Sequence, residues 1–323
     1  MTDDNYNEEA INTLLSIVQE GDYILWLGSG LSKASGYKMW KDAVNFIAKH
    51  CGVEEFSQDE DPTIEELLSK AEDCKNLREN RYKDAIFETF SKIQLINDFS
   101  LTLLAQLPFK AIVTTNFDPI IKTIFPGNVH YYPLLPSIYL NSKPMPVYYL
   151  HGIADIDKSK NQNPQDLHYV LSTSEFDFAY STKRTSLGEG ESAEFLRQLL
   201  SHHSLLFVGA GLEELAFKSL FERIDTFVED YARIGHIRED NSLKRYALLP
   251  RTPIKTREYN DEDLINEIHK KEEERDIRFN KYRIRKILYQ KSEGPDEFEN
   301  LTQIIRKTLQ RLQSPEFRKN GNE

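Results

Sequence analysis

YILWLGSG, residues 23–30, decides the fold class, because a short apolar run stops abruptly at a serine flanked by glycines. The run from Tyr23 to Leu27 has the length and the continuous apolar character of a strand buried on both faces of a parallel sheet. Glycines at a strand exit permit a tight turn into the next element. We therefore predict a buried strand over 23–27 and a helix that begins near Leu31.

The same pattern returns three times further along the chain. Buried runs are expected at Ala111–Thr115, Val147–Leu150 and Ser204–Val208, and each is followed by polar or glycine residues. Two later strand candidates, Arg245–Leu249 and Arg283–Tyr289, precede an amphipathic closing helix. Strands that alternate with helices along the whole length predict an α/β fold, namely a doubly wound, mostly parallel, Rossmann-like sheet.

The segment from 51 to about 107 differs in character from the rest of the chain. It is acidic, and Ile64, Leu67, Leu68 and Ala71 recur at helical spacings of three and four. We therefore expect a helical insertion there. A length of 323 residues allows one large domain or two small ones. We expect a single domain over 1–323, closed by a strand and a helix at about 281–313.

Composition excludes several classes of protein. A net charge of −11 opposes direct binding to nucleic acid, because such binding is driven by Lys and Arg that replace counterions on the phosphates. No apolar stretch approaches the length of a membrane span, and the acidic start MTDDNYNEEA lacks the features of a secretory signal. We expect a cytoplasmic protein. Its two cysteines, Cys51 and Cys74, cannot supply a four-cysteine zinc ribbon, so we expect no metal.

The first strand exit carries candidate phosphate ligands. Gly28, Ser29, Gly30 and Ser32 precede or begin the next helix, where backbone N–H groups can hold a pyrophosphate. Lys33 stands where the dehydrogenase fingerprint has its third glycine, which disfavours a hydride-transferring dehydrogenase. The alternative, a glycine turn needed only for chain reversal, is as well supported by these residues alone.

The second strand exit reads TTNFD, residues 114–118. Buried amides and carboxylates cost free energy unless they are paired, so three polar side chains here are hard to explain by packing. Asp118 fits a structural role as a helix cap before Pro119, whereas Asn116 fits that role less well. We interpret Asn116 as functional, and Thr115 and Asp118 as candidate contacts to a nucleotide.

Two further exits complete the pattern. LHG, residues 150–152, places His151 at a strand end, and an imidazole can exchange a proton near neutral pH. A lone histidine is usually structural, but the position of His151, which matches that of Asn116, favours a functional role. FVGAG, residues 207–211, places Gly209 and Gly211 where they contact a nucleotide or simply turn the chain.

The motifs GSGLS, TTNFD, LHG and FVGAG, in this order, resemble the sirtuin superfamily, and most nearly the bacterial sirtuin-like domains that act as NAD hydrolases in anti-phage defence. The similarity extends from about Gly21 to Leu312. Position by position, the resemblance implies a phosphate turn at Gly28, Ser29, Gly30 and Ser32, a nicotinamide end at Asn116 and Asp118, a catalytic histidine at His151, and a later glycine-rich exit at Gly209 and Gly211.

Departures from the family pattern narrow the expected activity. The family's protein deacylases carry a zinc ribbon after the histidine and a Phe-Arg pair after the first glycine motif. This chain has no cysteines after His151 and reads GYKMW over residues 36–40. The resemblance therefore implies hydrolysis of NAD to nicotinamide and ADP-ribose. Two alternatives stay open, namely a non-catalytic sensor of NAD or ADP-ribose and an NAD-dependent protein deacylase.

The resemblance also implies a mechanism and partners. NAD is the expected substrate, with Asn116 orienting water or a ribose hydroxyl and His151 acting as the base, because an amide cannot ionise usefully. An enzyme that consumes NAD would be toxic if always active, so we expect control by a partner or by assembly into a homo-oligomer. The expected partners are a HerA-type ATPase, a short Argonaute or a phage protein.

Overall fold

A seven-stranded sheet forms the centre of the computed structural model, which describes residues 3–92, 99–125, 127–138, 143–156, 162–210, 244–251, 262–290, 292 and 298–314. All six strand pairings are parallel, and the order is β3-β4-β2-β1-β5-β6-β7. The strands are β1 (Tyr23–Leu27), β2 (Ile112–Thr114), β3 (Val129–Tyr131), β4 (Val147–Tyr149), β5 (Ser204–Val208), β6 (Arg245–Arg251) and β7 (Ile284–Gln290).

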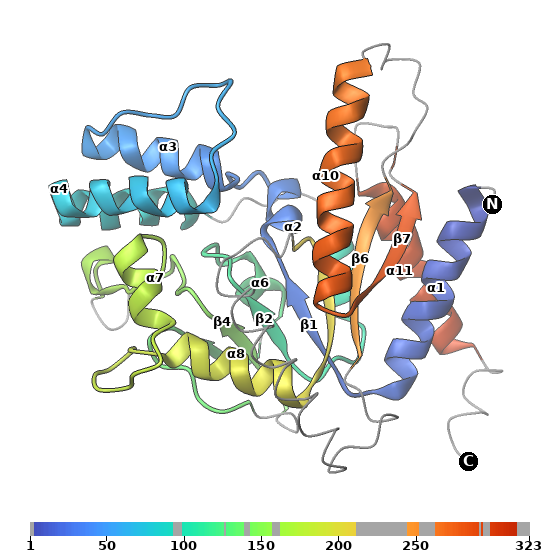
Figure 1. Ribbon diagram of the computed structural model, residues 1–323. Coiled ribbons are helices and arrows are strands. Elements are labelled where there is room, and N and C mark those ends of the chain that lie inside the picture. Colours follow the sequence, from blue (N-terminus) through green and yellow to red (C-terminus); the bar gives the residue numbers. More distant parts are fainter. Residues whose placement is uncertain are drawn as a thin grey trace, which may run out of the picture.

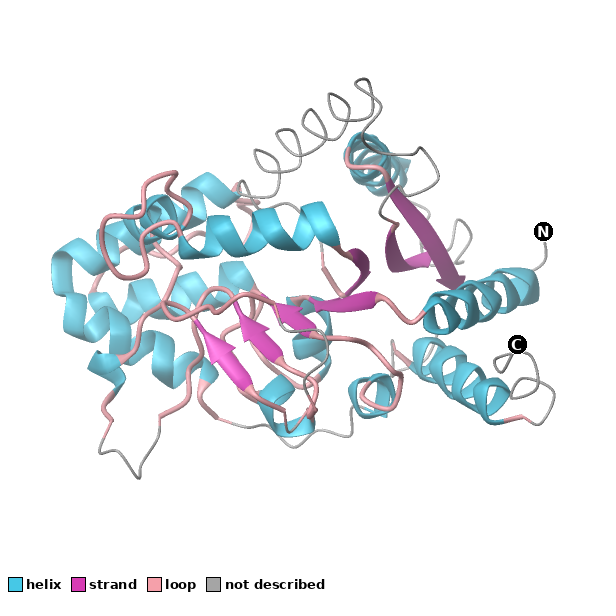
Figure 2. Cartoon of the chain, turned by 90° about the horizontal axis from the view of Figure 1, so that it is seen from below, coloured by secondary structure: helices cyan, strands magenta, loops and turns pink. Residues whose placement is uncertain are grey.

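Helices connect the strands and lie on both sides of them (Figure 2). The described helices are α1 (Asp3–Glu20), α2 (Ser29–Ala34), α3 (Trp40–Cys51), α4 (Ile64–Phe90), α5 (Phe99–Leu104), α6 (Ile120–Ile124), the 3-10 turn η2 (Pro164–Asp166), α7 (Thr173–Ala179), α8 (Glu191–His202), α10 (Glu262–Lys281) and α11 (Glu299–Gln313). The predicted doubly wound α/β fold is confirmed.

The central strand β1 is buried on both faces because its side chains alternate between two apolar layers. Leu25 and Leu27 belong to the layer that contains residues of α1 and α11, whereas Ile24 and Trp26 belong to the layer with α8 and the end of α10. Figure 1 shows α8 and α10 together on one side of the strands. Continuous apolar character in the run 23–27 thus follows from its place in the middle of the sheet.

The predicted bounds of β1, β2, β4, β5 and β7 match the structure to within one residue at each end, whereas β6 extends two residues beyond its predicted end. The prediction missed β3, which lies at the edge of the sheet next to β4. Its three residues are at most partly buried, so the segment carries neither a continuous apolar run nor a complete alternation. Edge position explains why the sequence signal is weak.

The described part of the segment from 51 to about 107 contains the last residue of α3 and all of α4 and α5. Helix α3 ends at Gly52, which has a left-handed φ of 79°, and α4 begins with a capping box between Thr63 and Glu66. Figure 1 shows α3, α4 and α7 grouped at one end of the molecule, far from α1 and α11. Residues of α3 and α4 lie next to the exits of β1 and β2.

Parallel pairing brings the carboxyl ends of β1, β2, β4 and β5 to one edge of the sheet. From β1 the strand order proceeds to β2 and β4 on one side and to β5 and β6 on the other. Ligands of open α/β sheets bind at such a switch point, beyond the carboxyl ends of the strands. A ligand site is therefore expected at the exits of β1 and β2.

Candidate functional site

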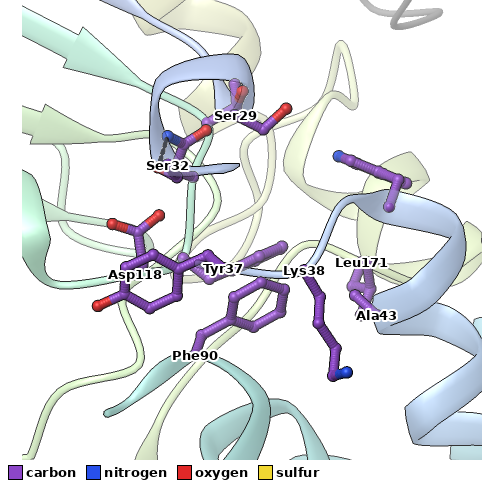
Figure 3. Close-up of a pocket in the computed structure, with 12 residues that line it drawn as sticks. Ser29, Ser32, Tyr37, Lys38, Ala43, Phe90, Asp118 and Leu171 are labelled. Atoms are coloured by element: carbon purple, nitrogen blue, oxygen red, sulfur yellow. Dashed lines mark hydrogen bonds between the residues drawn. The ribbon is translucent and has the colours of Figure 1, made fainter. Parts of the chain in front are cut away.

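A cavity lies at the exits of β1 and β2, between α2, α3 and the end of α4. In Figure 3, Ser29 and Ser32 lie at one end of it, and Phe90 and Lys38 lie at the other. Its lining contains five of the residues that the sequence analysis selected, namely Ser29, Ser32, Thr115, Asn116 and Asp118, and seven others, namely Tyr37, Lys38, Trp40, Ala43, Phe90, Phe117 and Leu171.

Asn116 is fixed by hydrogen bonds at both its backbone and its side chain. Its N–H donates to Thr114 Oγ1 over 3.1 Å, and Thr114 Oγ1 donates in turn to the carbonyl of Leu27 over 2.8 Å. Its Nδ2 donates to Ser32 Oγ over 2.9 Å. The side chain, only 7% exposed, therefore connects the exit of β2 to α2 at the cavity wall.

Asp118 combines a structural contact with a place in the cavity lining. Its Oδ1 accepts a hydrogen bond from the N–H of Ile120, the first residue of α6, whereas the N-cap position is occupied by Pro119. Burial raises the pKa of Asp118 to about 6. Interactions with Ser32 and with backbone N–H groups favour the charged form, but burial is the larger effect. The carboxyl group thus changes protonation close to neutral pH.

Ser32 is the centre of this polar group. Its hydroxyl accepts from Asn116 over 2.9 Å and lies close enough to the carboxyl group of Asp118 to favour the charged form of that group. The Ser32 side chain, which is 4% exposed, therefore connects α2 to the segment that follows β2.

Aromatic and apolar side chains form the rest of the lining, and the sequence analysis did not identify them. Tyr37 lies just before α3, Trp40 is the first residue of α3, and Phe90 is the last residue of α4. Phe90 packs on Phe117 with ring centroids 5.3 Å apart. The only signal in the sequence was GYKMW at residues 36–40, where the family's deacylases have a Phe-Arg pair. We interpreted it as the loss of a family motif and not as a source of aromatic side chains for the cavity.

His151 does not lie in the lining of this cavity. Its side chain is 0% exposed, and Nε2 is hydrogen-bonded to the hydroxyl of Tyr180 over 2.8 Å. Phe117, which does line the cavity, packs against the imidazole with ring centroids 6.3 Å apart. Burial lowers the pKa of His151 to about 3. The structure thus brings Asn116, Asp118 and Ser32 together and holds His151 behind Phe117.

The glycine turn after β1 packs closely against the exit of β5. The N–H of Gly28 donates to Val208 O over 3.0 Å, and the N–H of Gly30 donates to Gly209 O over 2.9 Å. A Cβ at Gly28 would stand 2.4 Å from Gly209 O, and one at Gly30 would stand 2.9 Å from it. These glycines therefore have a packing role in this structure. Gly211 lies outside the described residues.

Two observations concern metals and membranes. Within the described ranges, no group of three or more His, Cys, Asp or Glu side chains is arranged to hold a metal ion. None of the helices in the part of the chain that the structure covers is both long and apolar enough to span a bilayer.

Comparison with known proteins identifies the family. The model of the SIR2-like domain matches residues 110–285, which is more than half of the chain and includes TTNFD, LHG and FVGAG. Comparison with curated proteins gives no match. Among solved structures, a chain described in work on the mechanism and regulation of Sir2 enzymes matches with a TM-score of 0.46 and 13% identity, over 97% of this chain and 99% of that one. This protein belongs to the SIR2-like domain family.

Proposed function

We propose that this protein hydrolyses NAD to nicotinamide and ADP-ribose. The observation that carries the proposal is the amide of Asn116, hydrogen-bonded to Ser32 and beside the carboxyl of Asp118 in the lining of one cavity of a SIR2-like domain. The aromatic lining suits a flat pyridine ring.

The reaction breaks the bond between C1′ of the ribose and the pyridinium nitrogen. The electron pair of that bond leaves with nicotinamide, which becomes neutral, while positive charge develops on the ribose. A water oxygen then bonds to C1′, and one water proton is released, so the products are nicotinamide, ADP-ribose and H⁺. A carboxylate at Asp118 would stabilise the developing charge, and the Asn116 amide would orient the water or a ribose hydroxyl.

His151 is our candidate for the proton acceptor. A neutral imidazole has one unprotonated nitrogen, which can accept the proton that the water loses. Such proton transfer contributes roughly 10²–10⁴-fold to a rate. In the described conformation Nε2 is bonded to Tyr180 and the ring lies behind Phe117. The catalytic form therefore requires a rearrangement that lets the imidazole reach the cavity.

Nicotinamide release tests the proposal. Purified protein would be incubated with NAD in H₂¹⁸O, with heat-denatured protein as the blank. We expect free nicotinamide together with ADP-ribose that carries one ¹⁸O at C1′. Label at that position distinguishes hydrolysis from transfer to another acceptor. No nicotinamide above the blank, at millimolar NAD and with each candidate activator in turn, would refute the assignment.

The enclosure of His151 favours a second candidate, a sensor that binds NAD or ADP-ribose without cleaving it. A buried imidazole that is already hydrogen-bonded is poorly placed to take a proton. A sensor would show saturable binding of both ligands by calorimetry and no nicotinamide after prolonged incubation. A protein deacylase is less favoured, because both cysteines precede the histidine and are buried.

The biological setting is part of the same proposal. We infer an NAD-depleting effector of anti-phage defence, active in the cytoplasm as a homo-oligomer or under the control of a HerA-type ATPase, a short Argonaute or a phage protein. Adding each candidate to the nicotinamide assay separates these possibilities, since only the true activator raises the rate.

A further inference from the structure

His151 is clamped by two aromatic side chains from one short stretch of the chain. Its ring meets Tyr180 edge to face, with centroids 5.8 Å apart, and Phe176 at 6.0 Å, while Phe176 and Tyr180 pack on each other at 4.6 Å. The Tyr180 hydroxyl lies 2.8 Å from Nε2. The imidazole is thus held by one directed hydrogen bond and two ring contacts on the side of α7.

The hydrogen bond has a chemical consequence. An imidazole has two ring nitrogens, and the neutral form uses one as donor and the other as acceptor. When Nε2 is bonded to Tyr180, that nitrogen is not available to a ribose hydroxyl or a water in the cavity. Any route by which His151 accepts a proton through Nε2 must first break the contact with Tyr180.

We propose that Tyr180 is a positioning residue that holds His151 away from the substrate cavity, so that the described conformation is a restrained form of the site. This inference rests on the proposed NAD hydrolysis, since it assigns a regulatory role to a contact of that same site. Release of Tyr180 lets the imidazole turn past Phe117 toward Asn116.

Tyr180 is well placed to be displaced. It is the first residue after α7, and the residues that follow it, 182–187, are exposed to solvent. A partner that binds this loop pulls directly on Tyr180. The described form can therefore be unlocked from the surface without disturbing the sheet.

A second connection runs from the cavity itself to α7. Leu171 lines the cavity, and its N–H donates to Glu175 Oε2 over 3.1 Å. Glu175 also forms the capping box of α7 with Ser172 and accepts a hydrogen bond from Tyr82 of α4. A ligand that contacts Leu171 therefore acts on the helix that ends at Tyr180.

Chemical labelling of His151 tests the restraint without NAD. Diethyl pyrocarbonate would be added to the wild type and to Tyr180→Phe, and modification of each histidine followed by mass spectrometry. His50, which is exposed, serves as the internal reference. Loss of one hydrogen bond is worth about 1 kcal/mol, so we expect labelling of His151 to rise about fivefold in Tyr180→Phe.

Tyr169→Phe is the matched control. Tyr169 is also buried and packs on Phe117 at 5.9 Å, but its hydroxyl has no hydrogen-bond partner in the described part of the chain. Removing that hydroxyl should leave the labelling of His151 unchanged. Equal labelling of His151 in wild type and Tyr180→Phe overturns the proposed restraint, as does an equal rise in Tyr169→Phe.

Kinetics separate this inference from the proposed function. We expect Tyr180→Phe to raise kcat for nicotinamide release several-fold with little change in KM, because the change frees a proton acceptor rather than a binding contact. Nicotinamide release by the wild type with unchanged kcat in Tyr180→Phe overturns the restraint and leaves the hydrolase. Increased labelling without nicotinamide from any variant supports the restraint and refutes the hydrolase.

Discussion

The side-chain amide of Asn116 donates to the hydroxyl of Ser32 over 2.9 Å, across the gap between the exit of β2 and the first helix after β1. Ser32 also favours the charged form of Asp118, so both polar residues after β2 interact with one hydroxyl. This coupling predicts that changes at Asn116 and Ser32 will not have independent effects.

We expect Asn116→Ala to lower the rate of nicotinamide release about 100-fold, because the water or ribose hydroxyl loses its orienting group. Ser32→Ala should lower it less, since the amide stays but loses its anchor. The double variant should be no worse than Asn116→Ala, and a cycle of kcat/KM values measures this.

Two control variants accompany that cycle. Ser35→Ala removes a buried hydroxyl with no hydrogen-bond partner among the described residues, and Asn12→Ala removes an exposed amide on α1. Both should retain wild-type rates. Additive losses in the double variant would contradict the shared role of the Ser32 hydroxyl.

The sequence was sufficient to predict the strands that are buried on both faces, because a position in the sheet interior requires an unbroken apolar run. It also located the polar exits after β2 and β4, since polar side chains at the end of such a run stand out. Edge strand β3 lacks this signal.

The aromatic wall and the environment of His151 could not be predicted in this way. Trp40 begins α3 and Phe90 ends α4, and no local spacing in the sequence links them. His151 was correctly located after a strand, but the direction of its ring depends on Phe117 and Tyr180, which contact it only in the folded chain.

Asp118→Asn should make stability depend less on pH. The folded state holds the proton of Asp118 up to a pKa of about 6, whereas the unfolded state releases it near 3.8. The contribution of Asp118 to the free energy of unfolding should therefore fall as pH rises from 4 to 7, by on the order of 2–3 kcal/mol. The variant should lack this fall, which urea unfolding at pH 4 and pH 7 measures.

Asp59→Asn, at an exposed site, is the control. An identical pH dependence in wild type and Asp118→Asn would contradict the argument.

His151→Gln should act in the opposite direction. Burial lowers the pKa of His151 to about 3. Below pH 6.5 the imidazole is therefore protonated in the unfolded chain but stays neutral in the folded chain. The contribution of His151 to the free energy of unfolding should fall as pH decreases from 6.5, by up to about 1.4 kcal/mol per pH unit. The variant should lose this component and also lose nicotinamide release. His50→Gln provides the matched exposed control, and parallel stability curves for wild type and His151→Gln would exclude a buried neutral imidazole.

Gly28→Ala should destabilise the protein whatever its ligand. The added methyl would meet Gly209 O at 2.4 Å and Ala210 Cα at 2.5 Å, and backbone atoms cannot move aside cheaply. We expect a loss of about 3 kcal/mol or more in the free energy of unfolding. Gly52→Ala, where a Cβ meets no atom within 4 Å but φ is +79°, should lose about 1 kcal/mol. Equal losses in urea unfolding would rule out close packing of the two strand exits.

The central place of β1 has a consequence for how the chain is made. The ribosome completes β1 early, yet its two neighbours, β2 and β5, are separated from it by long stretches of sequence. At a translation speed of about 5–20 residues per second, β1 waits on the order of ten seconds or more for β5 to emerge. During that interval a wholly apolar segment is without its permanent partners. Chaperone demand during synthesis should therefore be concentrated on the nascent residues 23–27.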